Sequence, residues 1–584
     1  MTKKRELNHD PGKIAAQRLE KETGAVVKEP GGRLSVALAY PNQYEVGMSN
    51  LGLQKIYHLF NRRDDVLCER VFLPAPKEIE FLKKNRRPLE SMETGRALRT
   101  FDLLAFSITF EMDYINVLTM LNLAKIPFKG RTFDDPMIVA GGICVTLNPE
   151  LMAPFLDLAF IGEGEGVIDP FVDALLMSGT FSMSPFGGLP GVYAPSAYEP
   201  EYKKDGAIER IEIKSGFPEK VIRAWAKDYK DNPNVTVIET PDTVFGDMIL
   251  IETGKGCGRH CRFCAAGYAY RPTRFAGYTA LTKLIDSALD SERKIGLVGS
   301  NISDHPDMER IFEYIVNKGG KFSVSSMRID RLTGRTLQLM NKGGVKTITV
   351  APEAGTESLR RRISKDISDR TIVNSARLIG KAGAFDLKLY FLVGLPGEEQ
   401  KDVEAIVELV ESIREAMVNA SKERGTVGKI RVGVNGFVPK PFTPFQWAPY
   451  AGIKQVGDKL KIVKSGLKKT PGVTVQTSSA RYDYVQTLLS VGDRRVAEAL
   501  ELAYKHDGDW FKAIKETDID CDYFVTRQKS VNEILPWSFI DHGLRDDYLS
   551  RDSERSEKGK IIAECPPPDE KCDRCGDFEC GVSH

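Results

Sequence analysis

Short apolar runs alternate with segments of helical period in the first third of the chain. Strand-like runs cover residues 34–40, 66–72, 103–108, 137–142 and 158–164. Helical periodicity appears between them, for example at 50–60 and 167–176. Strands that alternate with helices predict a parallel sheet covered on both faces. We therefore expect an α/β, doubly wound, Rossmann-like domain over residues 33–179, after a polar arm at 1–32.

Residues 180–245 lose this alternation and are rich in proline and glycine, which predicts an ordered connector with some irregular strands. A second alternation follows over residues 246–475. Its strand-like runs cover 248–254, 294–300, 321–327, 346–354, 387–397 and 430–439. Six such units are fewer than the eight that close a TIM barrel, so we expect a partial (β/α)6 barrel with an open side.

The remaining chain divides into two parts. Residues 476–550 have a mainly helical pattern, and residues 551–584 are expected to be a linker followed by a cysteine-rich tail. The charged run 551–560 is typical of a solvated linker.

Composition narrows the class of protein. The 584 residues are 42% hydrophobic, enough to build cores and exclude general disorder. Lys plus Arg number 82 and Asp plus Glu 81, a balance that argues against binding nucleic acid by net charge alone. The first ten residues lack an apolar signal segment, and no run of about 18 apolar residues occurs. We expect a cytoplasmic protein without a membrane partner.

Seven of the ten cysteines lie in two groups, Cys257, Cys261 and Cys264, and, in the tail, Cys565, Cys572, Cys575 and Cys580. In a reducing compartment, clustered thiols hold metal more often than they form disulfides. The scattered Cys68, Cys144 and Cys521 are expected to be small buried side chains.

The first group follows the first strand of the second alternation, where barrel active sites are built. Three thiolates can bind three corners of a [4Fe-4S] cluster and leave the fourth iron open. A structural zinc ion normally takes four ligands. His260 adjoins Cys261 and would have difficulty completing such a site.

The C-x3-C-x2-C spacing, with Phe263 before the last cysteine, resembles the radical S-adenosylmethionine superfamily, as do the six units after it. This resemblance implies a [4Fe-4S] cluster whose open iron binds S-adenosylmethionine. It also implies reductive cleavage of that cofactor to a 5'-deoxyadenosyl radical, with electrons from a low-potential donor such as flavodoxin or ferredoxin.

The same resemblance assigns the S-adenosylmethionine site to residues at or beside the strand ends. The candidates are Phe263, Gly299, Ser300, Ser326, Arg328, Glu353 and Gly394. Each is equally explained by barrel packing or a turn.

The first domain resembles the cobalamin-binding-like domain of many radical relatives. Gly141, Gly142, Gly162 and Gly164 match its glycine loop and a following strand end. The D-x-H-x-x-G element that supplies a cobalt ligand is missing, because residues 41–52 contain no histidine. Cobalamin without a protein ligand and a domain kept only for its shape both remain open.

Taken together, the order of domains resembles an uncharacterised bacterial family of radical S-adenosylmethionine enzymes. Bound cobalamin would favour methyl transfer, and its absence would favour rearrangement, oxidation or sulfur insertion. The substrate is unknown. There are two alternatives. One is an RNA-modifying radical enzyme, which leaves nucleic acid open as a partner, and the other is a non-catalytic metal-binding or redox protein.

The tail cysteines fit one zinc ion or an auxiliary iron–sulfur cluster, or no metal at all.

Overall fold

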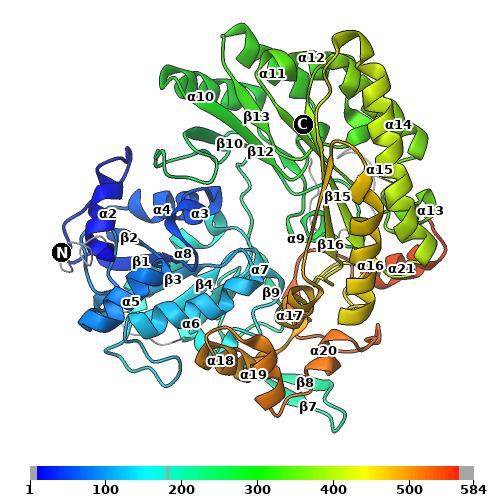
Figure 1. Ribbon diagram of the computed structural model, residues 1–584. Helices are drawn as coiled ribbons and strands as arrows, with labels where there is room; N and C mark the ends of the chain where they lie inside the picture. Colours follow the sequence, from blue (N-terminus) through cyan, green and yellow to red (C-terminus); the bar gives the residue numbers. More distant parts are fainter. Residues whose placement is uncertain (1–8, 179–182, 564–584) are drawn as a thin grey trace.

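The computed structural model describes residues 9–178 and 183–563 (Figure 1). Its first sheet has six strands in the order β2-β1-β3-β4-β5-β6, and only β6 runs antiparallel to its neighbour. These strands are β1 (Leu34–Tyr40), β2 (Val66–Phe72), β3 (Leu103–Ser107), β4 (Met137–Gly141), β5 (Leu158–Phe160) and β6 (Val192–Tyr193).

Helices cover both faces of this sheet (Figure 1). On one face lie α4 (Leu51–Asn61) and α8 (Ile168–Ser178), and Arg63, just after α4, pairs with Asp173 of α8 at 2.6 Å. Helices α5 (Pro76–Asn85) and α6 (Tyr114–Leu123) pack on the other face. The expected doubly wound domain is confirmed.

The second alternation forms two sheets that follow one another along the chain. The first has the order β11-β10-β12-β13 and the second β14-β15-β16-β17. All neighbours are parallel except the β10–β11 pair. Their bounds are β10 (Met248–Lys255), β11 (Arg274–Phe275), β12 (Lys294–Gly299), β13 (Phe322–Val324), β14 (Thr347–Glu353), β15 (Asp386–Val393), β16 (Ile430–Gly436) and β17 (Val473–Thr477).

Six of these eight strands are the predicted ones, and β11 and β17 are additions that the sequence pattern did not indicate. Their alternating apolar side chains are buried, as in β15, where every second residue is inaccessible. Helices α10 (Tyr278–Asp290), α11 (Met308–Asn317), α12 (Gly334–Lys342), α14 (Asp369–Ala382), α15 (Gln400–Ala420) and α16 (Ile453–Gly466) lie outside the strands (Figure 1). The α/β class with parallel sheets is confirmed. We call residues 248–477, which contain both of these sheets, the barrel domain.

The connector contributes one strand to the first sheet and three strands to two small two-stranded sheets. Strand β6 extends the first sheet, β7 (Tyr198–Tyr202) and β8 (Ile208–Ile213) form a hairpin, and β9 (Val221–Ile222) pairs with β18 (Ile540–Asp541). The helical region after the barrel contains α17 (Ala480–Val491), α18 (Ala497–Lys505), α19 (Trp510–Glu516) and α20 (Cys521–Val525), as expected.

The prediction of a solvated linker at 551–560 was wrong for most of that segment. Residues Tyr548–Glu557 form helix α21, which lies beside α13 (Glu357–Arg362) (Figure 1). Asp552 and Ser556 are buried there, because Asp552 pairs with a buried arginine of the barrel domain. Among the described helices, none combines the length and apolar character needed to cross a membrane.

Candidate functional site

The first three grouped cysteines lie in one loop, residues 256–265, between β10 and the short helix α9 (Ala266–Ala269); we call it the cluster loop. It starts with a sharp turn at Gly256, where φ is +72° and a β-carbon would lie 2.2 Å from the carbonyl oxygen of Tyr270. The Cys264 amide donates to the Cys261 carbonyl over 3.0 Å, which folds the loop back on itself. All three cysteines are half-buried.

The thiols influence one another. Burial, reinforced by neighbouring Cys261, raises the pKa of Cys257 to about 12 and that of Cys264 to about 11. Burial also raises the pKa of Cys261, although Lys365 and Arg328 oppose it. The thiols are therefore protonated on their own, and bound iron would take the place of their protons.

The donor set fits an iron–sulfur cluster. In a cubane cluster each thiolate binds a different iron, whereas zinc draws its ligands around one point. Within residues 9–178 and 183–563, no three His, Cys, Asp or Glu side chains are arranged around a single ion position.

Two cations close to Cys261 complement the charge of such a cluster. Lys365 is buried, and its ammonium lies 2.9 Å from Glu353 Oε1. Arg328 is held by Asp330 through bonds of 3.0 and 2.9 Å. Both side chains lower the pKa of the Cys261 thiol. Of the predicted S-adenosylmethionine residues, Arg328 and Glu353 are thus brought together beside a cysteine.

The other predicted residues share the carboxyl-end rim of the barrel strands but make different contacts. Gly299 ends β12, Ser326 is exposed after β13, and Gly394 follows β15 and donates its amide to the Glu398 carboxylate over 2.9 Å. Phe263 packs against a small core that includes Leu359. Their roles toward S-adenosylmethionine stay predictions.

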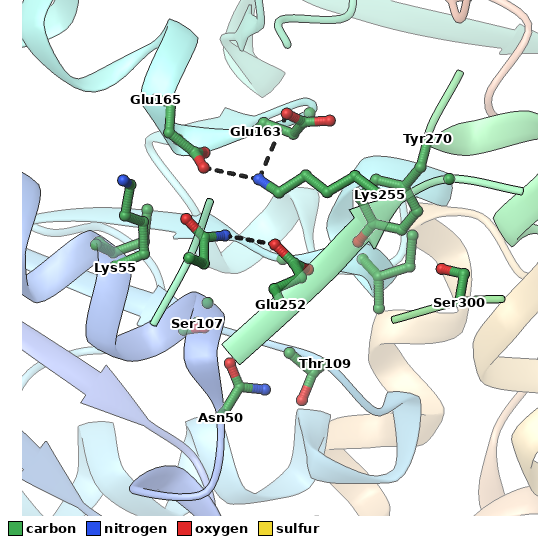
Figure 2. A pocket seen from close by; sticks show the side chains of 18 residues that line it. Asn50, Lys55, Ser107, Thr109, Glu163, Glu165, Glu252, Lys255, Tyr270 and Ser300 are labelled. Carbon is green, nitrogen blue, oxygen red and sulfur yellow. Dashed lines mark hydrogen bonds and ion pairs between the residues drawn. The ribbon is translucent and has the colours of Figure 1, made fainter. Parts of the chain in front are cut away.

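A cavity of about 300 Å³ lies where the first sheet meets β10; we call it the junction cavity (Figure 2). On the barrel side it is lined by Glu252, Lys255, Gly256, Tyr270 and Ser300. From the first domain and connector it is lined by Asn50, Gly52, Lys55, Ile56, Ser107, Thr109, Gly142, Ile143, Gly162, Glu163, Gly164, Glu165 and Asn234. This position matches the switch point of a doubly wound sheet with strand order 2-1-3-4-5, at the carboxyl ends of β1 and β3.

Five charged side chains line this cavity: Lys55, Glu163, Glu165, Glu252 and Lys255 (Figure 2). Lys255 Nζ lies 2.7 Å from Glu165 and 3.5 Å from Glu163. Burial opposes ionisation of Glu163, but Lys255 and Arg274 outweigh it and lower its pKa to about 2. Burial raises the pKa of Glu252 to about 6 and lowers that of Lys55. The cavity suits a polar occupant.

Three of the four glycines predicted to hold cobalamin line the cavity, and Gly141 does not. Contacts within the chain itself explain why two of these positions are glycine. Gly142 and Gly162 have φ of +101° and +116°, and their β-carbons would lie 2.3 Å from the Ile108 carbonyl oxygen and 2.1 Å from the Ala224 carbonyl oxygen. Close backbone packing therefore requires glycine at both positions, whatever the ligand.

Some residues at the site had no signal in the sequence analysis. Lys365 lies shortly after three consecutive arginines, so the sequence gives no reason to single out its charge. Arg262 lies between two cysteines, but its partner Asp552 is 290 positions away. The tail residues Cys565, Cys572, Cys575 and Cys580, predicted to bind a second metal, lie outside the described residues.

Comparison with known proteins supports the domain order. Residues 251–410 match the model of the radical SAM superfamily, and residues 52–185 match that of the N-terminal region of radical SAM proteins. The uncharacterized protein MJ0966 of Methanocaldococcus jannaschii is 27% identical over 82% of this chain and 94% of its own length.

Two radical enzymes are among the solved structures to which this chain is similar. OxsB, a cobalamin-dependent S-adenosylmethionine radical enzyme, is 14% identical over 67% of this chain, with a TM-score of 0.45, and the chain spans 56% of OxsB. The radical S-adenosylmethionine methyltransferase TsrM from Kitasatospora setae is 13% identical over 68% of this chain and 72% of its own, with a TM-score of 0.44.

Radical SAM proteins use a [4Fe-4S] cluster and S-adenosylmethionine, and they need a reductant and a substrate. The superfamily match begins in β10 and includes the cluster loop and the five strands β11 to β15. The chain therefore contains a radical S-adenosylmethionine domain and is an enzyme of the radical S-adenosylmethionine type.

Proposed function

We propose that Cys257, Cys261 and Cys264 hold the [4Fe-4S] cluster and that this protein cleaves S-adenosylmethionine there. The observation that carries the proposal is that three half-buried thiols lie in one folded loop at the carboxyl end of β10. When bound and reduced, the cluster supplies the electron that releases a 5'-deoxyadenosyl radical. Lys365 and Arg328 balance the negative charge around Cys261.

The other residues of the site are assigned to binding S-adenosylmethionine and the substrate. We assign Arg328 and Glu353, beside Cys261, to the polar end of S-adenosylmethionine, and Phe263, Gly299, Ser300, Ser326 and Gly394 to the surrounding rim. The junction cavity is our candidate substrate site, because it is lined by Gly256, which belongs to the cluster loop, and by Ser300, which follows β12. Its charges favour a small polar molecule over an RNA strand.

Anaerobic reconstitution tests this function. Protein loaded with iron and sulfide, reduced with dithionite and given S-adenosylmethionine should release 5'-deoxyadenosine and methionine, measured by chromatography with mass spectrometry. A structural or redox-sensing metal site cannot carry out this reaction, so loaded protein without cleavage would favour the non-catalytic alternative. We propose a cytoplasmic flavodoxin or ferredoxin as the natural electron donor. Reduced flavodoxin should support cleavage when it is used in place of dithionite.

Cobalamin-linked methyl transfer is the second candidate function. It is favoured by the junction cavity, which lies at the sheet edge where doubly wound domains bind their ligands. A complete cobalamin is larger than this cavity of about 300 Å³, so it would extend beyond the cavity or displace part of the lining. Gly142, Gly162 and Gly164 would lie nearest to it.

Cobalamin bound there should carry no protein imidazole on cobalt, because no histidine is among the described residues that line the cavity. Absorption and electron paramagnetic resonance spectra of protein loaded with cobalamin check this. Nitrogen coupling from a histidine would contradict the expectation. Failure to load would assign the domain a scaffolding role only.

We also propose that Cys565, Cys572, Cys575 and Cys580 bind a second metal, zinc or an auxiliary cluster. Deleting residues 564–584 should leave iron at the cluster loop, because three thiols suffice there. Metal analysis of the truncated and full-length proteins is the measurement. Loss of one zinc, or of a second set of irons, would identify the tail metal, whereas loss of iron from the loop would show a shared cluster.

A further inference from the structure

Two side chains between the cysteines, His260 and Arg262, are buried against helix α21. The His260 ring packs edge-to-face on Tyr548, with ring centroids 6.5 Å apart. Arg262 Nε and Nη2 donate to Asp552 Oδ1 over 2.9 and 2.7 Å. A helix near the end of the described chain therefore contacts the cluster loop at its centre.

Arg262 also joins the loop to the main chain of two other segments. Its Nη1 donates to the Arg362 carbonyl over 2.7 Å, and its Nη2 donates to the Lys560 carbonyl over 2.6 Å. Its own amide donates to the Ile363 carbonyl over 3.0 Å. The cluster loop, the end of α13 and the segment after α21 thus meet at one guanidinium group.

The Arg262–Asp552 pair is completely buried, with 0% exposure of both side chains. Burying an ion pair costs desolvation free energy, so such a pair is weak evidence for stability alone. Neither residue lines the junction cavity or is a proposed cluster ligand. Arg262 lies between Cys261 and Cys264, so the pair fixes the backbone that connects these two cysteines.

We propose that Asp552 is a positioning residue for the cluster: through Arg262, it holds the cluster loop in the form that presents three thiols together. The inference rests on the proposed function, which gives the loop a cluster to bind. Partners that orient metal ligands typically change metal affinity by about 10–100-fold when they are replaced. Helix α21 is then part of the cluster site, although it lies far from the motif in sequence.

The test compares Asp552→Asn with Glu554→Gln, which removes one charge from an exposed position of the same helix. Both proteins are reconstituted anaerobically, and iron retention against a chelator and the electron paramagnetic resonance spectrum of the reduced cluster are measured. Asp552→Asn should retain iron at least about tenfold less tightly and show an altered spectrum. Glu554→Gln should match the wild type, and Asp552→Glu should recover part of the retention. Wild-type retention and spectrum in Asp552→Asn would overturn the inference.

A paired variant covers the case in which Asp552→Asn does not fold. Arg262→Met combined with Asp552→Leu removes both charges at similar volume, a replacement that is often neutral for stability. The folded double variant, checked by circular dichroism, should also hold iron weakly, and normal retention would contradict the proposal. Wild-type protein that takes up no cluster would instead contradict the proposed function itself.

Discussion

Replacing Cys257, Cys261 and Cys264 together with alanine should abolish cleavage of S-adenosylmethionine and remove about four irons per chain. Each thiolate is expected to bind a different iron, so no corner of the cluster keeps a protein ligand. The apoprotein should fold nearly as well as the wild type, because the buried thiols have raised pKa values and lose no charge on replacement. Iron analysis and release of 5'-deoxyadenosine measure the effect.

The matched control is Cys521→Ala, a buried cysteine of helix α20 outside the cluster loop. It should keep its iron and its cleavage rate and lose only a little stability. Cleavage at the wild-type rate in the triple variant would exclude the cluster loop as the site of radical formation.

Glu163→Gln should lower the free energy of unfolding by about 3–5 kcal/mol, the range for breaking a buried ion pair. The Glu163 side chain is 3% exposed. It accepts from Arg274 Nη1 and from the Ala226 amide, both over 2.9 Å, and lies 3.5 Å from Lys255. Glutamine would leave buried Arg274 of the barrel domain without its counter-charge and would leave Lys255 paired with Glu165 alone. Chemical denaturation of the two proteins gives the difference.

The same carboxylate predicts an acid-dependent loss of stability. The pKa of Glu163 is lowered from 4.5 to about 2, so its contribution is complete above pH 4.5 and disappears as the pH falls toward 2. Glu163→Gln should therefore flatten the decline of stability over this interval. Glu165→Gln, which loses only the 2.7 Å contact with Lys255, is the control and should cost less. Equal slopes for wild type and Glu163→Gln would contradict the assignment.

Local pattern was sufficient for most of the fold. The run at 248–254 became Met248–Lys255, and the run at 34–40 became β1 with the same bounds. Buried parallel strands are continuous in hydrophobicity and short, so their positions can be read without knowledge of their partners. Strand β17 was missed because it is only five residues long and none of its side chains is fully buried.

The cysteine spacing was likewise readable, because all three residues lie in one loop and need no distant partner to be recognised. The glycines were a weaker guide. Gly162 was interpreted as a ligand-binding residue, yet the approach of Ala224 from the connector is enough to require glycine there. A glycine pattern cannot distinguish a backbone that approaches a ligand from one that approaches another part of the same chain.

Hydrophobic periodicity and motif spacing are properties of neighbouring residues, and they specified the strands, the order of domains and the three cysteines from the chain alone. The burial of charges depended on contacts between distant segments. Residues 551–560 look like solvated linker because Asp, Glu, Arg and Lys are normally exposed. Asp552 is buried only because the fold brings Arg262 to it from 290 residues away, and Glu163 only because Lys255 and Arg274 of the barrel domain face the first sheet. Pairs of this kind have no local signature in the sequence. The Arg262–Asp552 pair at the cluster loop and the ion pairs of the junction cavity are therefore apparent only in the tertiary structure.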